Sequence, residues 1–186
     1  MNILEIYKID QTVFTSQELL QFFPGDAPQQ LNNALHYAVK TGKLKRLRRG
    51  VYAKNNYAVN ELANSIYIPS YISLETVLRT HGIIFQTDTS IQSVSYLSRD
   101  IVIEELRFVY RKIKYSILTN PKGLIVNGRE TVASPERALL DSLMVFKNYH
   151  FDNLAPIDWS LVDDLIPIYQ SKILIRKITK LRKDIN

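Results

Sequence analysis

A chain of 186 residues can hold one large domain or two small ones, and it can bury a core without disulfides or metals. Its composition is ordinary for a globular protein and includes no cysteine, which excludes disulfide scaffolds, thiolate zinc sites, iron–sulfur clusters and cysteine nucleophiles. The net charge is +6, and no apolar stretch reaches the length of about 18 residues that a membrane span needs. The N-terminal residues lack the features of a secretion signal, so we expect a cytoplasmic protein with no membrane partner.

The positive charge is concentrated in two regions. Seven basic residues and no acidic residue lie between Asp26 and Glu61, and six basic residues against Asp184 lie from Lys172 onward. Residues 61–171 hold 10 basic and 13 acidic residues. Such a regional imbalance is expected when one module binds nucleic acid and another does not, although a basic run can also be an ordinary solvated surface.

Local signals predict two helices at the start of the chain. Residues 2–9 have the spacing of a short amphipathic helix. Thr15 followed three residues later by Glu18 is a capping-box pattern, which predicts a helix that runs to about Phe23. Pro24-Gly25-Asp26 then breaks it.

A third helix is predicted over residues 28–41, because a proline opens it and Gly42 follows as a C-terminal cap. Its apolar residues form one narrow stripe at helical spacing: Leu31, Ala34, Leu35 and Ala38. The opposite face has no carboxylate and carries Gln29, Asn33, His36 and Lys40, with Asn32 and Tyr37 flanking it. These six residues and Gln30 are expected to contact DNA. Amides and imidazole donate and accept hydrogen bonds, as the reading of base edges requires.

The next segment, residues 43–53, is predicted to be a basic hairpin of two short strands joined at Arg48-Arg49-Gly50. The element order predicts a winged helix-turn-helix DNA-binding domain over residues 1–56, with its third helix in the major groove. The hairpin cations are expected to contact phosphates: Lys43, Lys45, Arg46, Arg48 and Arg49. A lone histidine such as His36 is more often an ordinary surface residue than a contact, and His36 lacks partners for a zinc site, so no metal or cofactor is expected.

Residues 57–186 are predicted to form a second domain of mixed α/β structure, so that the fold class is α+β. Helices are predicted over residues 58–67, 73–81, 135–146, 160–170 and from 172 onward. Runs rich in β-branched and aromatic residues indicate strands at 91–97, 101–103, 106–113, 115–118 and 124–126.

No catalytic motif is present, and we expect a protein that is not an enzyme. Residues 134–141 form the one dense polar cluster. Ser134 is placed to cap a helix there, and Arg137 and Asp141 lie four residues apart, which predicts an ion pair on one helix.

Three segments, in order, resemble the AbiEi-type antitoxins. Residues 44–52 (LKRLRRGVY) are similar to the wing of that family. Residues 71–78 (YISLETVL), followed by 81–84 (HGII), resemble its Tyr-x-Ser-x-Glu-x-x-Leu and His-Gly-Leu-Ile motifs. Residues 132–141 (VASPERALLD) are similar to its Ala-Ser-Pro-Glu-Arg-Ala-Leu-Leu-Asp stretch, so the resemblance spans about 14–143.

The resemblance implies an antitoxin of a type IV toxin–antitoxin system, of the kind associated with abortive infection. It implies an N-terminal winged helix that represses transcription of its own operon by binding double-stranded DNA, with an inverted-repeat operator. It also implies a C-terminal antitoxin domain that counters a nucleotidyltransferase-like toxin and need not form a stable complex with it. Two monomers that pair on the DNA would occupy both halves of such an operator, so a dimer in solution is not required.

Two alternatives remain open. A stand-alone winged-helix transcription regulator would use its C-terminal domain to sense a ligand or partner, and a toxin-like neighbouring gene would distinguish the two. A nucleic-acid-processing enzyme would need converging acids or a metal, and the scarcity of paired carboxylates argues against it.

Overall fold

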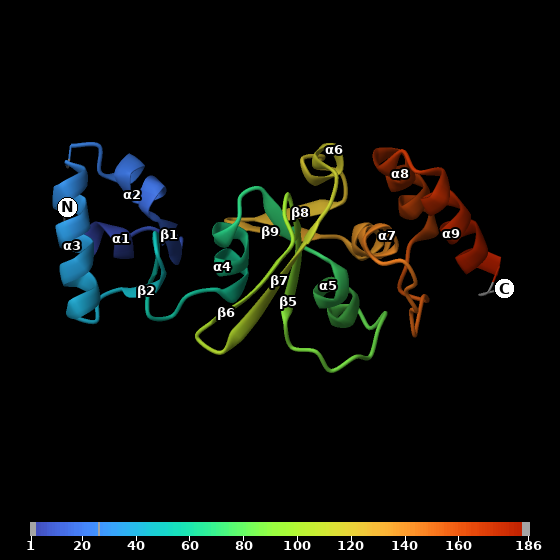
Figure 1. The fold of residues 1–186 in the computed structure, drawn as a ribbon, viewed down its shortest axis with the longest axis horizontal. Helices are drawn as coiled ribbons and strands as arrows, with labels where there is room; N and C mark the ends of the chain where they lie inside the picture. Colours follow the sequence, from blue (N-terminus) through green and yellow to red (C-terminus); the bar gives the residue numbers. More distant parts are fainter. Residues whose placement is uncertain (1–2, 26, 184–186) are drawn as a thin grey trace. The chain divides into compact units, whose positions relative to one another are not determined.

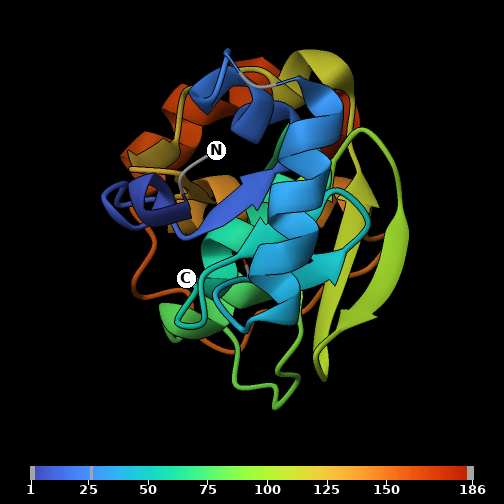
Figure 2. The same ribbon diagram turned by 90° about the vertical axis from the view of Figure 1, so that its left-hand side faces the viewer.

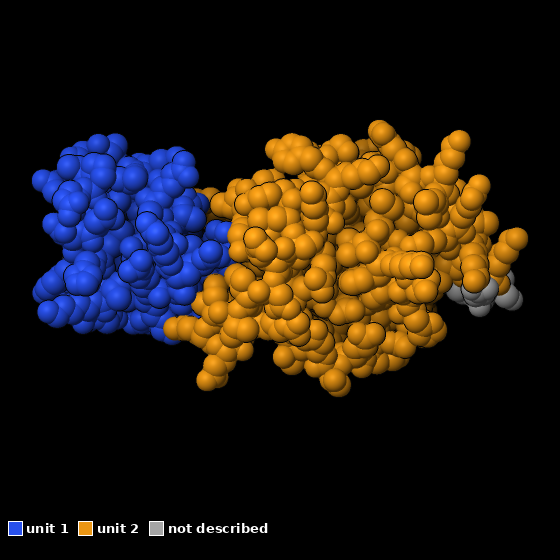
Figure 3. All heavy atoms as spheres, in the orientation of Figure 1, with its two compact units in different colours: residues 1–66 blue, residues 67–186 orange. Residues whose placement is uncertain are grey.

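The computed structural model describes residues 3–25 and 27–183, and the chain divides into two compact units, residues 1–66 and 67–186 (Figure 3). The division follows α4 (Val59–Ile66), whereas the sequence placed it between residues 56 and 57. The reason is visible in Glu61, whose carboxylate accepts the backbone N–H groups of Thr12 and Val13 at 2.7 and 3.0 Å. By these contacts α4 belongs with the first unit.

The first unit combines short helices with a three-stranded antiparallel sheet of order β1-β3-β2 (Figure 1). Besides α4, its elements are α1 (Ile3–Tyr7), β1 (Val13–Thr15), α2 (Ser16–Phe22), α3 (Pro28–Lys40), β2 (Lys45–Arg48) and β3 (Val51–Ala53). The predicted capping box is confirmed: Thr15 Oγ1 accepts the Glu18 N–H at 3.2 Å, and Glu18 Oε2 accepts the Thr15 N–H at 2.8 Å. Asp26, predicted in the break before α3, lies outside the described residues.

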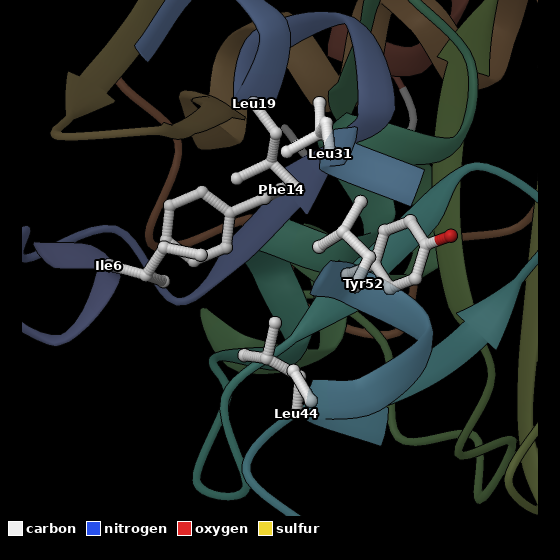
Figure 4. Close-up of a cluster of buried hydrophobic side chains, with 8 residues drawn as sticks. Ile6, Phe14, Leu19, Leu31, Leu44 and Tyr52 are labelled. Atoms are coloured by element: carbon white, nitrogen blue, oxygen red, sulfur yellow. The ribbon is translucent and has the colours of Figure 1, made fainter. Parts of the chain in front are cut away.

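The core of the first unit is built around the apolar stripe of α3 (Figure 4). Leu31, Leu35 and Ala38 are buried as predicted, and Ala34 is half-buried. Leu31, Leu35 and Ala38 share one cluster with residues from the surrounding elements: Ile6, Phe14, Leu19, Leu44 and Tyr52. Because this stripe faces inward, the amide-bearing face of α3 faces outward.

The second unit contains a six-stranded mixed sheet of order β6-β7-β5-β4-β9-β8. Its strands are β4 (Ser70–Ile72), β5 (Ile91–Ser95), β6 (Arg99–Ile103), β7 (Leu106–Lys112), β8 (Leu124–Asn127) and β9 (Glu130–Ala133). The β4–β9 and β5–β7 pairs are parallel, and the other neighbours are antiparallel. The α+β class is therefore confirmed.

Five helices of the described chain accompany this sheet: α5 (Leu74–Thr80), α6 (Tyr115–Leu118), α7 (Pro135–Val145), α8 (Trp159–Tyr169) and α9 (Lys172–Lys183). α5 packs on β5 and on α7, and α8 and α9 pack in turn on α7 (Figure 1). One prediction is wrong: residues 115–118, expected as a strand, form α6. Ser134 caps α7 as predicted, since its Oγ accepts the Arg137 N–H at 3.2 Å.

Arg137 and Asp141 lie at the centre of a buried polar network in the second unit. Both side chains are fully buried, and Arg137 Nε lies 3.9 Å from Asp141 Oδ1, too far for a hydrogen bond. Asp141 instead accepts hydroxyl groups from Tyr71, Ser73 and Tyr169 at 3.0, 2.8 and 2.7 Å. Burial raises the pKa values of Tyr71 and Tyr169 well above their ordinary range, so both hydroxyls stay protonated and donate.

The guanidinium of Arg137 connects α7 to the chain that precedes β8. Its Nη2 donates to the Ile117 carbonyl at 2.7 Å and to the Tyr71 hydroxyl at 3.0 Å. Its Nη1 donates to the carbonyls of Asn120 and Lys122. The predicted ion pair within α7 is confirmed, and the hydrogen bonds of its two side chains also join α7 to β4, α6, α8 and the turn after α6.

Gly123 closes that turn and provides a stability prediction. Its φ of +71° lies in the left-handed region, and an added Cβ would come within 3.0 Å of Leu165 and 3.2 Å of Arg137 Cβ. We expect Gly123→Ala to lower the free energy of unfolding by about 2 kcal/mol or more, through backbone strain plus crowding. Urea denaturation measures this loss and compares it with the loss in Gly128→Ala. At Gly128 φ is +58°, but no atom lies within 4 Å of an added Cβ. Equal losses in the two variants would show that crowding at Gly123 is unimportant.

Candidate nucleic-acid interface

The outward face of α3 presents a narrow polar stripe. Gln29, Asn33, His36 and Lys40 follow one another at intervals of four, three and four residues, and all four are exposed. At the rise of an α-helix they cover roughly 16 Å along a single face. Figure 2 shows α3 with no other element of the first unit lying across it. The flanking Asn32 and Tyr37 are exposed too.

The two amide side chains of the stripe, Gln29 and Asn33, are hydrogen-bonded to each other. Gln29 Nε2 donates to Asn33 Oδ1 at 3.3 Å, which leaves each amide with a donor and an acceptor for another partner. Gln30 is exposed as well, but its Oε1 accepts the N–H of Ala27 at 3.4 Å. Gln30 therefore also supports the first turn of α3, a local role that the sequence analysis did not anticipate.

The hairpin of β2 and β3 is confirmed, and its turn is anchored to α2. Gly50 adopts a φ of +79° in the turn, and its carbonyl accepts the N–H of Ser16 at 2.9 Å. Arg48 and Arg49 are exposed at this anchored turn. The register shifts between Arg46 and Arg48, so the strand is irregular just before the turn.

The predicted hairpin cations differ in their surroundings. Lys43, Arg46, Arg48 and Arg49 are exposed, whereas Lys45 is half-buried with its ammonium 5.6 Å from the ring centre of Tyr57. Tyr57 was not among the predicted site residues, although an aromatic residue close after a basic run is a signal for such a contact.

The described acidic residues of the first unit are mostly engaged elsewhere. Glu5 pairs with Lys8 at 2.9 Å, Glu18 closes the capping box, and Glu61 is buried against the start of β1. Asp10 is exposed between α1 and β1. The α3 face and the hairpin together thus present cations and amides without an intervening carboxylate on these elements, a surface suited to a polyanion.

Within residues 3–25 and 27–183, no three or more His, Asp or Glu side chains gather so as to hold a metal ion. Across those residues, no helix combines the length and apolar character needed to cross a membrane. The second unit contains a cavity of about 900 Å³ beside residues 147–157, which the sequence analysis did not identify.

Comparison with known proteins adds no relative to this description. No model of a protein family matches the chain. No curated protein matches it either. The resemblance to AbiEi-type antitoxins therefore rests on the three sequence motifs alone.

Proposed function

We propose that this chain is a DNA-binding transcriptional autorepressor whose first unit acts as a winged helix-turn-helix. The observation that carries the proposal is the exposed, carboxylate-free amide face of α3 beside an anchored arginine hairpin. In this role α3 enters the major groove, where an α-helix fits, and its N-terminal amides contact base edges. The hairpin arginines lie on phosphates, because a guanidinium fork matches phosphate oxygens.

One wing and one recognition helix read one half-site. Tight operator binding therefore requires two copies in register on an inverted repeat, with centres one helical turn or a multiple of it apart. Two monomers that assemble on the DNA satisfy this geometry, so the proposal does not depend on a dimer in solution.

Asn33 provides the test of base readout. We expect Asn33→Ala to lose about 1–3 kcal/mol of discrimination, because an amide suited to a bidentate contact with adenine is removed from an exposed position. Binding to the operator and to a scrambled duplex of equal length is measured side by side by fluorescence anisotropy. Operator affinity should fall while affinity for the scrambled duplex is retained. Equal losses on both duplexes would show that this face of α3 does not read bases.

The second half of the proposal is antitoxic activity of the second unit against a nucleotidyltransferase-like toxin. It is supported by the resemblance of the segments around Tyr71 and Ser134. The test is growth rescue beside the cognate toxin, with the protein expressed from an unrelated promoter so that repression cannot contribute. Rescue by the intact chain and by residues 67–186 supports the proposal.

A second candidate is a stand-alone regulator whose second unit senses a ligand. The cavity beside residues 147–157 favours this candidate, because small molecules bind in cavities of this kind. The same rescue experiment separates the candidates. Promoter binding without rescue by either the intact chain or the second unit would favour the regulator.

A further inference from the structure

The cavity of the second unit is lined by both cations and aromatic rings. It lies where residues 147–157 pass the end of α7 and the side of α9. Its volume of about 900 Å³ is within the range of small-molecule sites and far exceeds the need of a bare inorganic ion. Among its lining residues are three lysines and three aromatic residues: Lys147, Lys177, Lys180, Tyr149, Phe151 and Trp159.

The lysines give the lining a positive charge. Lys177 is held in place because its ammonium donates to the carbonyls of Leu143 and Phe146, at the end of α7, at 2.6 and 2.9 Å. Those two bonds leave one of its three N–H groups for a ligand. Lys147 and Lys180 are exposed, and among the described residues neither has a carboxylate within ion-pair distance.

Asp152 is the acidic residue of the lining, and its carboxylate is already engaged. Its Oδ2 accepts the N–H of Phe85 at 2.8 Å, and its Oδ1 lies 3.9 Å from His150 Nε2. The Asp152 carboxylate thus holds residues 147–157 against the backbone of Phe85. Against the three lysines, it leaves an excess of positive charge in the cavity.

The cavity wall formed by residues 147–157 is hydrogen-bonded to residues 82–83, which follow α5. The N–H groups of Asp152 and Asn153 both donate to the Ile83 carbonyl at 3.0 Å, and Asn153 Nδ2 donates to the Gly82 carbonyl at 3.3 Å. These bonds give a wall that exists before any ligand arrives, which lowers the entropy cost of binding.

Trp159 supplies a fixed aromatic surface at the first position of α8. It is half-buried, it lines the cavity, and the guanidinium of Arg182 lies 4.9 Å from its ring centre. Arg182 in turn pairs with Asp163 at 2.8 Å. An indole held in this way is suited to stacking with a flat ring of a ligand.

We propose that this cavity binds an organic phosphate that carries a flat aromatic ring, the class to which nucleoside monophosphates belong. The phosphate is held by Lys147, Lys177 and Lys180, and the ring lies against the aromatic part of the lining, with Trp159 as its principal contact. This goes beyond DNA binding by the first unit and does not depend on it. The failure of either proposal leaves the other standing.

The test uses the intact chain and the fluorescence of Trp159, its single tryptophan. Emission is excited at the red edge of indole absorption, where the bases do not absorb. The four common nucleoside 5′-monophosphates, adenosine and inorganic phosphate are titrated separately, and affinities are checked by calorimetry. We expect at least one monophosphate to change the emission saturably. Adenosine and inorganic phosphate should bind at least about tenfold more weakly, since each lacks one half of the recognised chemistry.

Matched lysine variants establish that the signal comes from this cavity. Lys147→Ala with Lys180→Ala should weaken monophosphate binding about tenfold or more, because two charge-assisted contacts are removed. Lys172→Ala with Lys183→Ala makes the same charge change on exposed positions of α9 outside the lining and should leave the affinity within about twofold. Circular dichroism confirms that both variants keep the fold.

Three results would overturn the proposal. The first is the absence of saturable binding by any of the monophosphates. The second is equal weakening in the two double variants, which would indicate a diffuse effect of net charge. The third is binding of inorganic phosphate or adenosine as tight as that of the monophosphates, which would show that the cavity does not recognise both parts.

Discussion

Arg137→Met is expected to lower the free energy of unfolding of the second unit by about 3–5 kcal/mol, the cost of removing one partner from a buried ionic network. The substitution keeps an apolar stem of similar length but removes every N–H donor of the guanidinium. Asp141 then lies fully buried without a cation, and the carbonyls of Ile117, Asn120 and Lys122 lose the hydrogen bonds that the guanidinium donates. The free energy of unfolding of a whole domain is only about 5–15 kcal/mol, so a loss of this size is a large fraction of it. Urea denaturation followed by circular dichroism measures it.

Two further variants separate burial from charge. Arg137→Lys keeps the positive charge but loses the planar fork that reaches several acceptors, so its stability should lie between those of Arg137→Met and the parent. Arg107→Met breaks an exposed bidentate pair with Asp100 and should leave the midpoint nearly unchanged, because exposed pairs are screened by solvent. If Arg137→Met unfolds at the same urea concentration as Arg107→Met, the buried network does not stabilise the fold.

Arg48→Ala combined with Arg49→Ala is expected to weaken binding to every duplex and to flatten its salt dependence. Each phosphate contact that is lost should reduce the slope of log K against log salt by about 0.9, so the pair should reduce it by roughly 1.8. Specificity should change little, because phosphate contacts carry no direct sequence information. Anisotropy titrations at several salt concentrations, on operator and scrambled duplexes, measure both quantities.

The control for this experiment removes the same charge from the second unit. Arg99→Ala with Lys114→Ala affects two exposed cations and should leave the slope unchanged. A slope that flattens equally in both double variants would indicate a general effect of net charge. An unchanged slope in the hairpin variant would show that the hairpin does not contact DNA.

The first unit shows what local sequence signals can predict. The capping box at Thr15, the proline that opens α3 and the glycine that follows it act within a few residues, so the predicted helices match closely. The exposure of the α3 amide face is confirmed for the same reason, because it follows from helical spacing. DNA contact by that face stays a prediction. The interactions of Gln30 with Ala27 and of Lys45 with Tyr57 depend on geometry that spacing does not show.

The second unit shows where local signals fail. Residues 115–118 have the composition of a strand but form α6, and the carbonyl of Ile117 there accepts from Arg137, far along the chain. The short strands β1 and β4 offer too few residues for a periodic pattern. The ion pair predicted from the spacing of Arg137 and Asp141 is present, but the hydrogen bonds of these two side chains go to residues far along the chain: Tyr71, Ser73, Ile117 and Tyr169. The signal available was the apolar run Ala138-Leu139-Leu140, which predicts burial around the whole helix.

Hydroxyl-radical footprinting of the intact protein on the DNA upstream of its own gene tests the central claim most directly. We expect two protected half-sites related by an inverted repeat, with centres a whole number of helical turns apart. At the same protein concentration Asn33→Ala should abolish this protection. Uniform weak protection along the duplex, or a discrete footprint that Asn33→Ala leaves intact, would contradict the assignment of α3 as the element that reads the operator.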